Sequence, residues 1–266
     1  MKIAITGASG YIGRHITALA KKNRHEVIAI DRSSDIDIFA QHQNVFEALQ
    51  KPDVLLHLAW RDGFKHNSPE HMKNLSHHYE FLHSYIHDGG KKVAVMGSMH
   101  EVGYWEGAID EHTPCDPLSQ YGVAKNALRQ SMMLLAKDCD AKLYWLRGFY
   151  IYGDDIGGHS IFSKIAQAAA DGKTEFPFTT GKNKYDFLHI DDFSDQVLAA
   201  ITQDDITGII NICSGKPVSL AERVEQYIRD NHYNITLQYG AFPDRPYDSP
   251  AVWGDASKMR AIKFSS

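Results

Sequence analysis

The sequence has few cysteines, no long apolar run and no marked excess of one charge. Its three cysteines are too few and too scattered for a disulfide framework or a metal site: Cys115, Cys139 and Cys213. No apolar stretch approaches the roughly 20 residues that cross a membrane, and residues 1–2 lead into a strand pattern rather than a signal peptide. We therefore expect a cytoplasmic protein with reduced cysteines and no membrane partner.

Charge and histidine content also argue against some partners. The formal net charge is −5, and the sequence has neither a long basic run nor an acidic tail, so nucleic acid is not an expected partner. Among the 15 histidines, His83 and His87 stand four positions apart on a predicted helix, a spacing that zinc sites use. That helix is expected to lie away from the active site, so we predict no metal. The expected partner is a small molecule.

Apolar runs alternate with longer, helix-compatible stretches in the first half of the chain. The runs at 2–6, 26–30, 54–59 and 93–96 predict buried strands, and the stretches at 12–22, 44–50 and 70–87 predict helices. This alternation is typical of right-handed crossovers and of a mostly parallel sheet with helices on both faces. The 266 residues, 43% of them hydrophobic, therefore predict an α/β doubly wound fold, followed by a smaller region.

Three glycines follow the first predicted strand in the stretch TGASGYIG, residues 6–13. In such a fold, ligands bind at the carboxyl edge of the sheet, where the next helix begins with unpaired N–H groups. Gly7, Gly10 and Gly13 let the backbone turn tightly and approach a pyrophosphate, while the helix dipole favours its negative charge. The stretch predicts a dinucleotide-binding turn, with Tyr11 and Ile12 among the residues that bind the cofactor.

The residue after the second predicted strand indicates which dinucleotide is bound. Asp31 stands where a carboxylate accepts hydrogen bonds from the adenosine ribose hydroxyls and repels a 2′-phosphate. This favours NAD. Arg32 follows directly, and because a guanidinium there can bind a phosphate, NADP stays possible.

A tyrosine and a lysine stand four positions apart in YGVAK, residues 121–125. On a helix, Tyr121 and Lys125 share one face, where an ammonium beside the phenol favours the phenolate and lowers the tyrosine pKa from about 10. Such pairs are common in helices. The order of the motifs along the chain is a more specific signal than the pair alone. The glycine turn comes first, and Ser98 lies between this turn and YGVAK, just past a predicted strand.

Taken in this order, the motifs resemble those of the extended short-chain dehydrogenase/reductase family, in the branch of nucleotide-sugar epimerases, dehydratases and 4-ketoreductases. The resemblance rests on TGASGYIG, DVLLHLAW (53–60), GSMHEVG (97–103), YGVAK, LRGFYIYG (146–153), DFLHIDD (186–192) and NICSG (211–215). It implies a Rossmann domain at 1–153 and 186–205, and a small C-terminal substrate-binding domain at 154–185 and 206–266. It also implies a homodimer formed through the helices at 70–87 and 119–137.

The resemblance assigns roles to individual residues. Tyr121 is implied as the catalytic acid/base, and Lys125 as the group that lowers its pKa and binds the cofactor ribose. Ser98 is implied to hydrogen-bond the substrate oxygen that gains or loses charge. Leu58 and Ala59, in the DVLLHLAW stretch, are implied to line the cofactor site.

Residues for the substrate are implied in the same way. Phe178 and Arg245 resemble positions that contact the base and the diphosphate of a nucleotide sugar. Asn74 is implied to support the loops of the active site through hydrogen bonds. His100 either donates a proton or orients the sugar, or is a histidine of the loop that packs beside the substrate.

Departures from the family pattern reduce the number of reactions that the sequence allows. Sugar-nucleotide 4,6-dehydratases place an Asp-Glu pair directly after the catalytic residue, where this sequence has Met99 and His100. Met99 cannot transfer a proton, so a conventional dehydratase is not expected. Few residues separate Asp31 from Asp53, a compactness like that of 4-ketoreductases, whereas a preference for NAD suits a 4-epimerase. Both reactions interconvert an alcohol and a ketone on a nucleotide sugar.

A second hypothesis is a catalytically inactive relative that binds NAD(P) and serves as a regulator or scaffold. Such a relative is expected to have lost the serine, the tyrosine or the lysine of the site. Ser98, Tyr121 and Lys125 are all present, so the sequence favours an enzyme.

Overall fold

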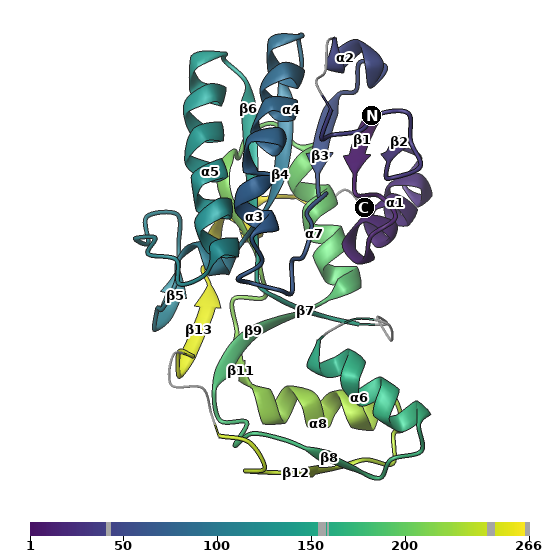
Figure 1. The fold of residues 1–266 in the computed structure, drawn as a ribbon, viewed down its shortest axis with the longest axis vertical. Coiled ribbons are helices and arrows are strands. Elements are labelled where there is room, and N and C mark those ends of the chain that lie inside the picture. Colours follow the sequence, from purple (N-terminus) through teal and green to yellow (C-terminus); the bar gives the residue numbers. More distant parts are fainter. Residues whose placement is uncertain (41–43, 154–157, 159, 244–247, 264–266) are drawn as a thin grey trace.

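The computed structural model describes residues 1–40, 44–153, 158, 160–243 and 248–263. Its larger part is a six-stranded sheet, made of β1 (Lys2–Thr6), β2 (Glu26–Ile30), β3 (Val54–His57), β4 (Lys92–Ser98), β6 (Lys142–Gly148) and β10 (Gly208–Ile212). The helices that accompany it are α1 (Tyr11–Lys22), α2 (Val45–Ala48), α3 (Glu70–Lys73), α4 (Leu75–His87), α5 (Gln120–Asp138), α7 (Ile190–Thr202) and α9 (Ser257–Ala261). Figure 1 shows this part above a smaller region.

The strands of the main sheet are all parallel and run in the order β10-β6-β4-β3-β1-β2. This confirms the predicted doubly wound fold. The chain leaves β1 toward β2 on one side and returns to β3 on the other, so the order reverses between β1 and β3. In open α/β sheets, this reversal opens a crevice at the carboxyl ends of the strands, where ligands bind.

Helices cover both faces of the sheet because successive strand residues point to opposite sides. Ile3 and Ile5 belong to the core that α1 and α7 cover, whereas Ala4 belongs to the core that α4 and α5 cover. Figure 1 shows α4 and α5 running side by side along one face. Both faces of β1 are therefore buried, which explains why its sequence is a continuous apolar run rather than an alternating one.

Several predicted boundaries differ from the structure. The expected helix at 70–87 is two helices, α3 and α4, that meet at Asn74. The expected strand at 54–59 ends at His57, and the helix expected at 44–50 is the four-residue α2. The small domain was expected to include 206–266, but β10 lies within this range and pairs with β6 in the main sheet. The apolar run of β10 is buried and extends the parallel sheet. The rest of the domain division stays a prediction.

The smaller region contains a second sheet, a two-stranded sheet and two helices. Its strands are β5 (Gly107–Ile109), β7 (Tyr150–Tyr152), β8 (Glu175–Pro177), β9 (Lys184–His189), β11 (Pro217–Ser219), β12 (Thr236–Gln238) and β13 (Ala251–Gly254), and its helices are α6 (Ile161–Ala170) and α8 (Leu220–Asp230). The second sheet has the order β11-β9-β13-β5, with β7 also paired to β9. Among the described residues, none of the helices combines the length and the apolar run that a bilayer crossing demands.

A buried carboxylate joins the two sheets. Asp186 of β9 accepts hydrogen bonds from the backbone N–H and the hydroxyl of Ser214, at 2.7 and 2.6 Å, in the turn after β10. It also accepts from the N–H groups of Gly215, at 2.9 Å, and Gly254 at the end of β13, at 3.1 Å. A carboxylate with four donors is well compensated for burial. Asp186 therefore fixes the second sheet against the end of β10.

We expect Asp186→Asn to lower the free energy of unfolding by about 3 kcal/mol, because the amide that replaces one oxygen points a donor at N–H groups that are already donors. Urea unfolding followed by circular dichroism measures the change. Asp138→Asn, at an exposed position at the end of α5, is the matched control and should change stability by less than about 0.5 kcal/mol. Equal changes in the free energy of unfolding for the two substitutions would contradict the role of Asp186 in fixing the second sheet to the end of β10.

Candidate functional site

The site begins where β1, β3 and β4 end, because parallel strands present their carboxyl ends at the same edge. Thr6 ends β1, His57 ends β3 and Ser98 ends β4. The first turn of α5 adds Tyr121, and the next adds Lys125. Ser119 begins this helix by accepting a hydrogen bond from the N–H of Gly122 at 3.1 Å, which sets where Tyr121 enters the site.

The glycine turn has the close packing that a phosphate-binding turn requires. Gly7 has a φ of +70°, and a Cβ there would stand 2.9 Å from the backbone nitrogen of Ala59. A Cβ on Gly13 would stand 2.1 Å from the carbonyl oxygen of Gly7. Gly10 precedes α1 without any side-chain cap, and the first turn of α1 holds no acidic residue. This helix end thus has neither a side-chain cap nor a negative charge that would compete with an anion, and the turn fits the pyrophosphate of a dinucleotide.

Other residues predicted for the cofactor lie around this turn. Thr6 accepts hydrogen bonds from the N–H groups of Leu58 and Ala59, both at 3.2 Å, which holds the end of β3 against the turn. Tyr11 and Ile12 begin α1, and both pack partly against the core below. The structure therefore brings Leu58 and Ala59 to the glycine turn, and their contact with the cofactor stays a prediction.

Asp31 lies beside the turn because Gly7 donates its N–H to the carbonyl of Ile30, at 2.8 Å. The Asp31 carboxylate accepts from the hydroxyl and the N–H of Ser33, at 2.6 and 2.9 Å, and these hydrogen bonds hold its pKa below the usual range. An ionised carboxylate at this place fits ribose hydroxyls and repels a phosphate. Arg32 is exposed next to it.

Tyr121, Ser98 and Lys125 come together in the structure, but one predicted effect is wrong. Burial raises the pKa of Tyr121 to about 12, Glu101 adds to the rise, and the hydrogen bond with the Ser98 side chain opposes it. Burial also lowers the pKa of Lys125 to about 7. Lys125 does not lower the tyrosine pKa, because its Nζ donates to the carbonyl of Met96 at 2.8 Å and lies 5.9 Å from the Tyr121 ring centroid. At neutral pH the phenol is therefore protonated.

Ser98 is held by a buried carboxylate. Oε1 of Glu101 accepts the backbone N–H of Ser98 at 2.6 Å, while the Ser98 hydroxyl accepts from the N–H of His100 at 3.3 Å. This reciprocal pair of hydrogen bonds is a capping box, and it caps the N-terminus of the short helix η1 (Met99–Glu101). Ser98 is therefore fixed by the turn that follows it.

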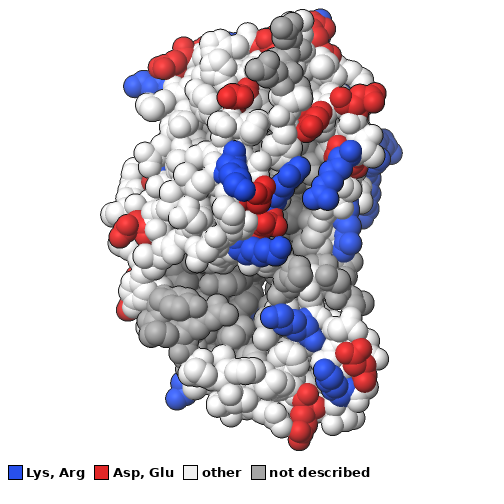
Figure 2. Space-filling model, viewed as in Figure 1, with Lys and Arg blue, Asp and Glu red and all other residues white. Residues whose placement is uncertain are grey.

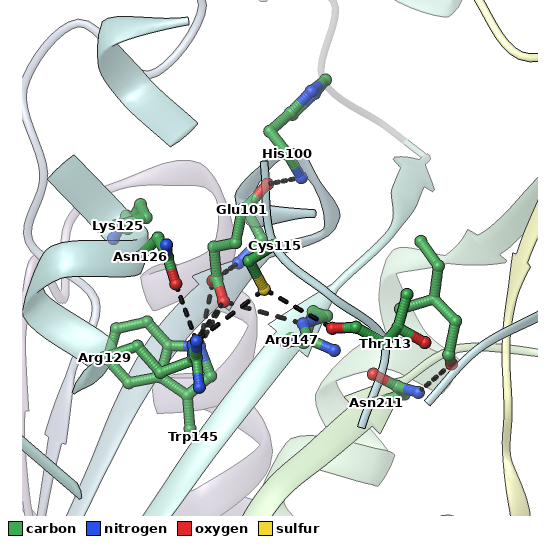
Figure 3. A network of polar contacts seen from close by, with 12 residues as sticks. His100, Glu101, Thr113, Cys115, Lys125, Asn126, Arg129, Trp145, Arg147 and Asn211 are labelled. Carbon is green, nitrogen blue, oxygen red and sulfur yellow. Dashed lines mark hydrogen bonds and ion pairs between the residues drawn. The ribbon is translucent and has the colours of Figure 1, made fainter. Parts of the chain in front are cut away.

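The carboxylate of Glu101 is 0% exposed and is surrounded by donors. Trp145 donates its indole N–H at 2.9 Å to Oε1, and the Nε atoms of Arg129 and Arg147 each lie 3.6 Å from Oε2. Figure 3 shows this cluster beside Lys125 and His100. Burial raises the pKa of Glu101, and the two arginines and the hydrogen bonds oppose that rise. Two positive neighbours favour its ionised form, and the indole bond fixes its orientation.

Histidine rings line one side of Tyr121. The ring of His66 stacks on Tyr121 with centroids 5.5 Å apart, and His100 lies 4.4 Å from His66 and 6.1 Å from Tyr121. Burial lowers the pKa of His100 to about 4, so its imidazole is neutral at neutral pH. The structure thus brings His100 to the site, where a neutral imidazole can donate or accept a hydrogen bond.

Two other predicted residues, Asn74 and Phe178, do not join this group. The amide of Asn74 donates to the carbonyl and the carboxylate of Glu70, at 2.8 and 3.2 Å, and so stabilises the junction of α3 and α4. Phe178 is 1% exposed in the core of the smaller region, so the prediction that it contacts a nucleotide base is not supported. Arg245 lies outside the described residues.

Comparisons with known proteins agree with this geometry. Residues 3–213 match the family model described as "NAD dependent epimerase/dehydratase family". The chain belongs to this family. The family's description also confirms NAD as the expected cofactor.

One relative and two solved structures illustrate the similarity. The dTDP-6-deoxy-L-talose 4-dehydrogenase (NAD(+)) of Aggregatibacter actinomycetemcomitans is 44% identical over 270 residues, which cover 96% of this chain and 99% of the relative. MoeE5 in complex with UDP-glucose and NAD has a TM-score of 0.81 at 23% identity, covering 100% of this chain and 93% of its own. The UDP-glucuronic acid 4-epimerase of Bacillus cereus, in complex with UDP-glucuronic acid and NAD, has a TM-score of 0.78 at 24% identity, covering 100% and 94%. These two structures share the fold.

Two further residues lie in the site although the sequence motifs assigned them no role. Trp60 is the last residue of DVLLHLAW. The Nζ of Lys125 lies 3.6 Å from the centroid of the Trp60 ring. His66 stacks on Tyr121 and accepts the Tyr121 backbone N–H with its carbonyl, at 2.9 Å. Both follow β3 at the binding edge of the sheet. That position was the available signal for them.

We expect Gly13→Ala to weaken NAD binding at least about 10-fold, because the added methyl group meets rigid backbone and forces the turn apart. Isothermal titration calorimetry with NAD measures the effect. Gly63→Ala is the control, since a Cβ there meets nothing within 4 Å. Unchanged NAD affinity in a folded Gly13→Ala protein would show that the cofactor does not use this turn.

Proposed function

We propose that the chain is an NAD-dependent 4-dehydrogenase, or in the opposite direction a 4-ketoreductase, of a nucleotide-activated 6-deoxyhexose. The observation that carries this proposal is the 44% identity to a dTDP-6-deoxy-L-talose 4-dehydrogenase (NAD(+)) across nearly the full length of both chains. The grouping of Ser98, Tyr121 and Lys125 at one edge of the sheet supports it, because this set suits the exchange of a proton at an alcohol or ketone oxygen.

The residues divide the reaction between them. The hydroxyl groups of Ser98 and Tyr121 hold the C4 oxygen of the sugar, and Tyr121 transfers the proton at that oxygen. NAD, when bound, takes or returns the hydride at the same carbon. Because the pKa of Tyr121 is raised to about 12, its phenol is ready to act as the acid when a ketone is reduced. In the oxidative direction the phenol must first lose its proton, so that the phenolate of Tyr121 can accept the proton of the sugar hydroxyl.

The surroundings of Ser98 do not favour dehydration of the sugar. Met99 directly follows Ser98 and is buried in the core of the smaller region, where its thioether cannot transfer a proton. Glu101 is occupied by Ser98, Trp145 and two arginines. A carboxylate engaged in this way is not free to take a proton from the sugar.

A substrate panel tests this function. We expect the protein to form NADH, measured by absorbance, when it is incubated with NAD and dTDP-6-deoxyhexoses, and to consume NADH with the matching 4-keto sugars. Sugar interconversion without net formation of NADH would identify an epimerase and contradict the dehydrogenase. No activity on any dTDP-, GDP- or UDP-sugar, with NAD still bound, would favour the inactive relative.

The role of Tyr121 has its own test. We expect Tyr121→Phe to lower kcat at least about 1000-fold, because the phenyl ring keeps the packing but carries no proton to transfer. The dissociation constant for NAD should change by less than about threefold. Tyr104→Phe, at an exposed tyrosine, is the control. Retained turnover in Tyr121→Phe would reject the catalytic role.

We also propose that the chain forms a homodimer through α4 and α5. A groove of about 330 Å³ runs between these helices, lined by Met72, Leu75, Ser76, Tyr79, Ala127, Leu128 and Ser131. Val123 and Leu134 lie on the same face of α5 as Ala127, and Leu134 is 66% exposed. Small residues in the groove allow the helices of a second copy to approach closely. Figure 2 has the same view as Figure 1 and so shows the side that carries α4 and α5. The surface over these helices is mostly uncharged, and lysines and arginines gather with acidic side chains nearer the centre of the view.

Sedimentation equilibrium tests the dimer. We expect the mass of a dimer for the unmodified protein and that of a monomer for Leu134→Glu, because a buried carboxylate without a partner costs several kcal/mol. Lys137→Glu, an exposed neighbour on the same helix, should remain dimeric. A monomeric unmodified protein would contradict the proposal.

A further inference from the structure

The indole ring of Trp60 is held on both faces and along one edge. The imidazole of His78 stacks on it with centroids 4.4 Å apart and planes 12° apart. The Nζ of Lys125 lies 3.6 Å from its centroid. Two groups at such distances cannot share one face of the ring, so the ammonium and the imidazole lie on opposite faces. Trp60 therefore separates Lys125 from His78.

The edge of the indole is fixed by a hydrogen bond that also fixes a tautomer. Trp60 donates its N–H to Nδ1 of His71 at 3.1 Å. Because Nδ1 accepts, the hydrogen of neutral His71 is on Nε2, which donates to the carbonyl of Lys65 at 3.0 Å. Trp60 is thus tied through His71 to the loop that follows β3.

The imidazole behind Trp60 is fixed in the same way. The Thr6 hydroxyl accepts two backbone N–H groups, so its own hydrogen is donated to Nδ1 of His57, at 2.9 Å. His57 then carries its hydrogen on Nε2 and donates it to Nδ1 of His78, also at 2.9 Å. Burial lowers the pKa of His57 to about 3 and that of His78 well below its usual value. Both rings are neutral and place no positive charge behind the indole.

Lys125 has little else to stabilise its charge. Its side chain is 2% exposed, and within the part of the chain that the structure describes its one hydrogen-bond acceptor is the carbonyl of Met96. A tryptophan face attracts an ammonium within about 6 Å, and the attraction is strongest when both are removed from water. The indole therefore offsets part of the cost of burying this charge.

We propose that Trp60 is a positioning residue that holds the charged ammonium of Lys125 at the base of the site, beside Tyr121. This inference rests on the proposed roles of Lys125 and Tyr121. Trp60 acts through Lys125: without the indole face, the amine loses part of its charge and its fixed place 5.9 Å from the Tyr121 ring, and with them its implied binding of the cofactor ribose.

The first test measures the pKa of Lys125 directly, with no substrate present. Lysine labelled with ¹³C at Cε is titrated by NMR in the unmodified protein, in Trp60→Leu and in Trp60→Phe, and Lys125→Met identifies the signal. We expect the Lys125 pKa to fall by about one pH unit in Trp60→Leu and by less in Trp60→Phe, which keeps an aromatic face. All three proteins keep the other titratable groups whose charges interact with Lys125, which are Glu101, His57 and His78, and they also keep Tyr121, whose ring centroid lies 5.9 Å from Nζ.

The second test compares binding and turnover. We expect Trp60→Leu to weaken NAD binding about 10-fold and to move the pH dependence of kcat/KM, with Trp60→Phe restoring most of both. Trp105→Leu is the matched control, because Trp105 lies in the smaller region and its indole donates to the carbonyl of Ala108. Thermal unfolding checks that each variant is folded. If Trp60→Leu is not folded, NAD binding and kcat/KM are compared between Trp60→Phe and the unmodified protein, and this comparison decides whether Trp60 has the proposed role.

The outcomes separate this inference from the proposed function. An unchanged Lys125 pKa and NAD affinity in folded Trp60→Leu, with the unmodified protein active on a nucleotide sugar, would overturn the role of Trp60 alone. The expected fall in the Lys125 pKa, with no variant and no unmodified protein active on any sugar of the panel, would support Trp60 and overturn the proposed reaction.

Discussion

The site depends on a lysine ammonium that is almost completely buried. Removing a charge from water is costly unless other groups replace the water, and Lys125 has three such neighbours. The carbonyl of Met96 accepts its hydrogen bond, the face of Trp60 lies beneath it, and the carboxylate of Glu101 raises its pKa. The effect of burial is nevertheless larger than that of these neighbours, and the pKa of Lys125 is lowered to about 7. The charge of this lysine is therefore sensitive to whatever binds beside it.

The parallel sheet makes this arrangement possible. β1, β3 and β4 are neighbours that end at one edge, so the glycine turn, Trp60 and Ser98 lie together although they are distant in sequence. Glu101 then fixes Ser98 from behind, held in turn by Trp145 and two arginines. Rigid surroundings of this kind keep reacting groups in place, which is a larger part of catalysis than the reactivity of any one group.

The fold and the position of the site were predictable because they depend on local rules. Gly7 and Gly13 stand where a Cβ meets backbone, and the spacing of Tyr121 and Lys125 places them on one helix face. The pKa of Tyr121 was not predictable, because its direction depends on burial rather than on the nearest charge in the sequence. The burial of Phe178 was not predictable for a similar reason: an aromatic residue has the same sequence signal in a core and in a binding pocket.

In the proposed reaction, Ser98 and Tyr121 share the oxygen at which the sugar is oxidised, with Lys125 beside them. A crystal structure with NAD and a dTDP-6-deoxyhexose measures this most directly. We expect the sugar C4 oxygen to lie within about 3.2 Å of both hydroxyl oxygens. A sugar bound with another oxygen at these hydroxyls, or away from Tyr121 altogether, would contradict it.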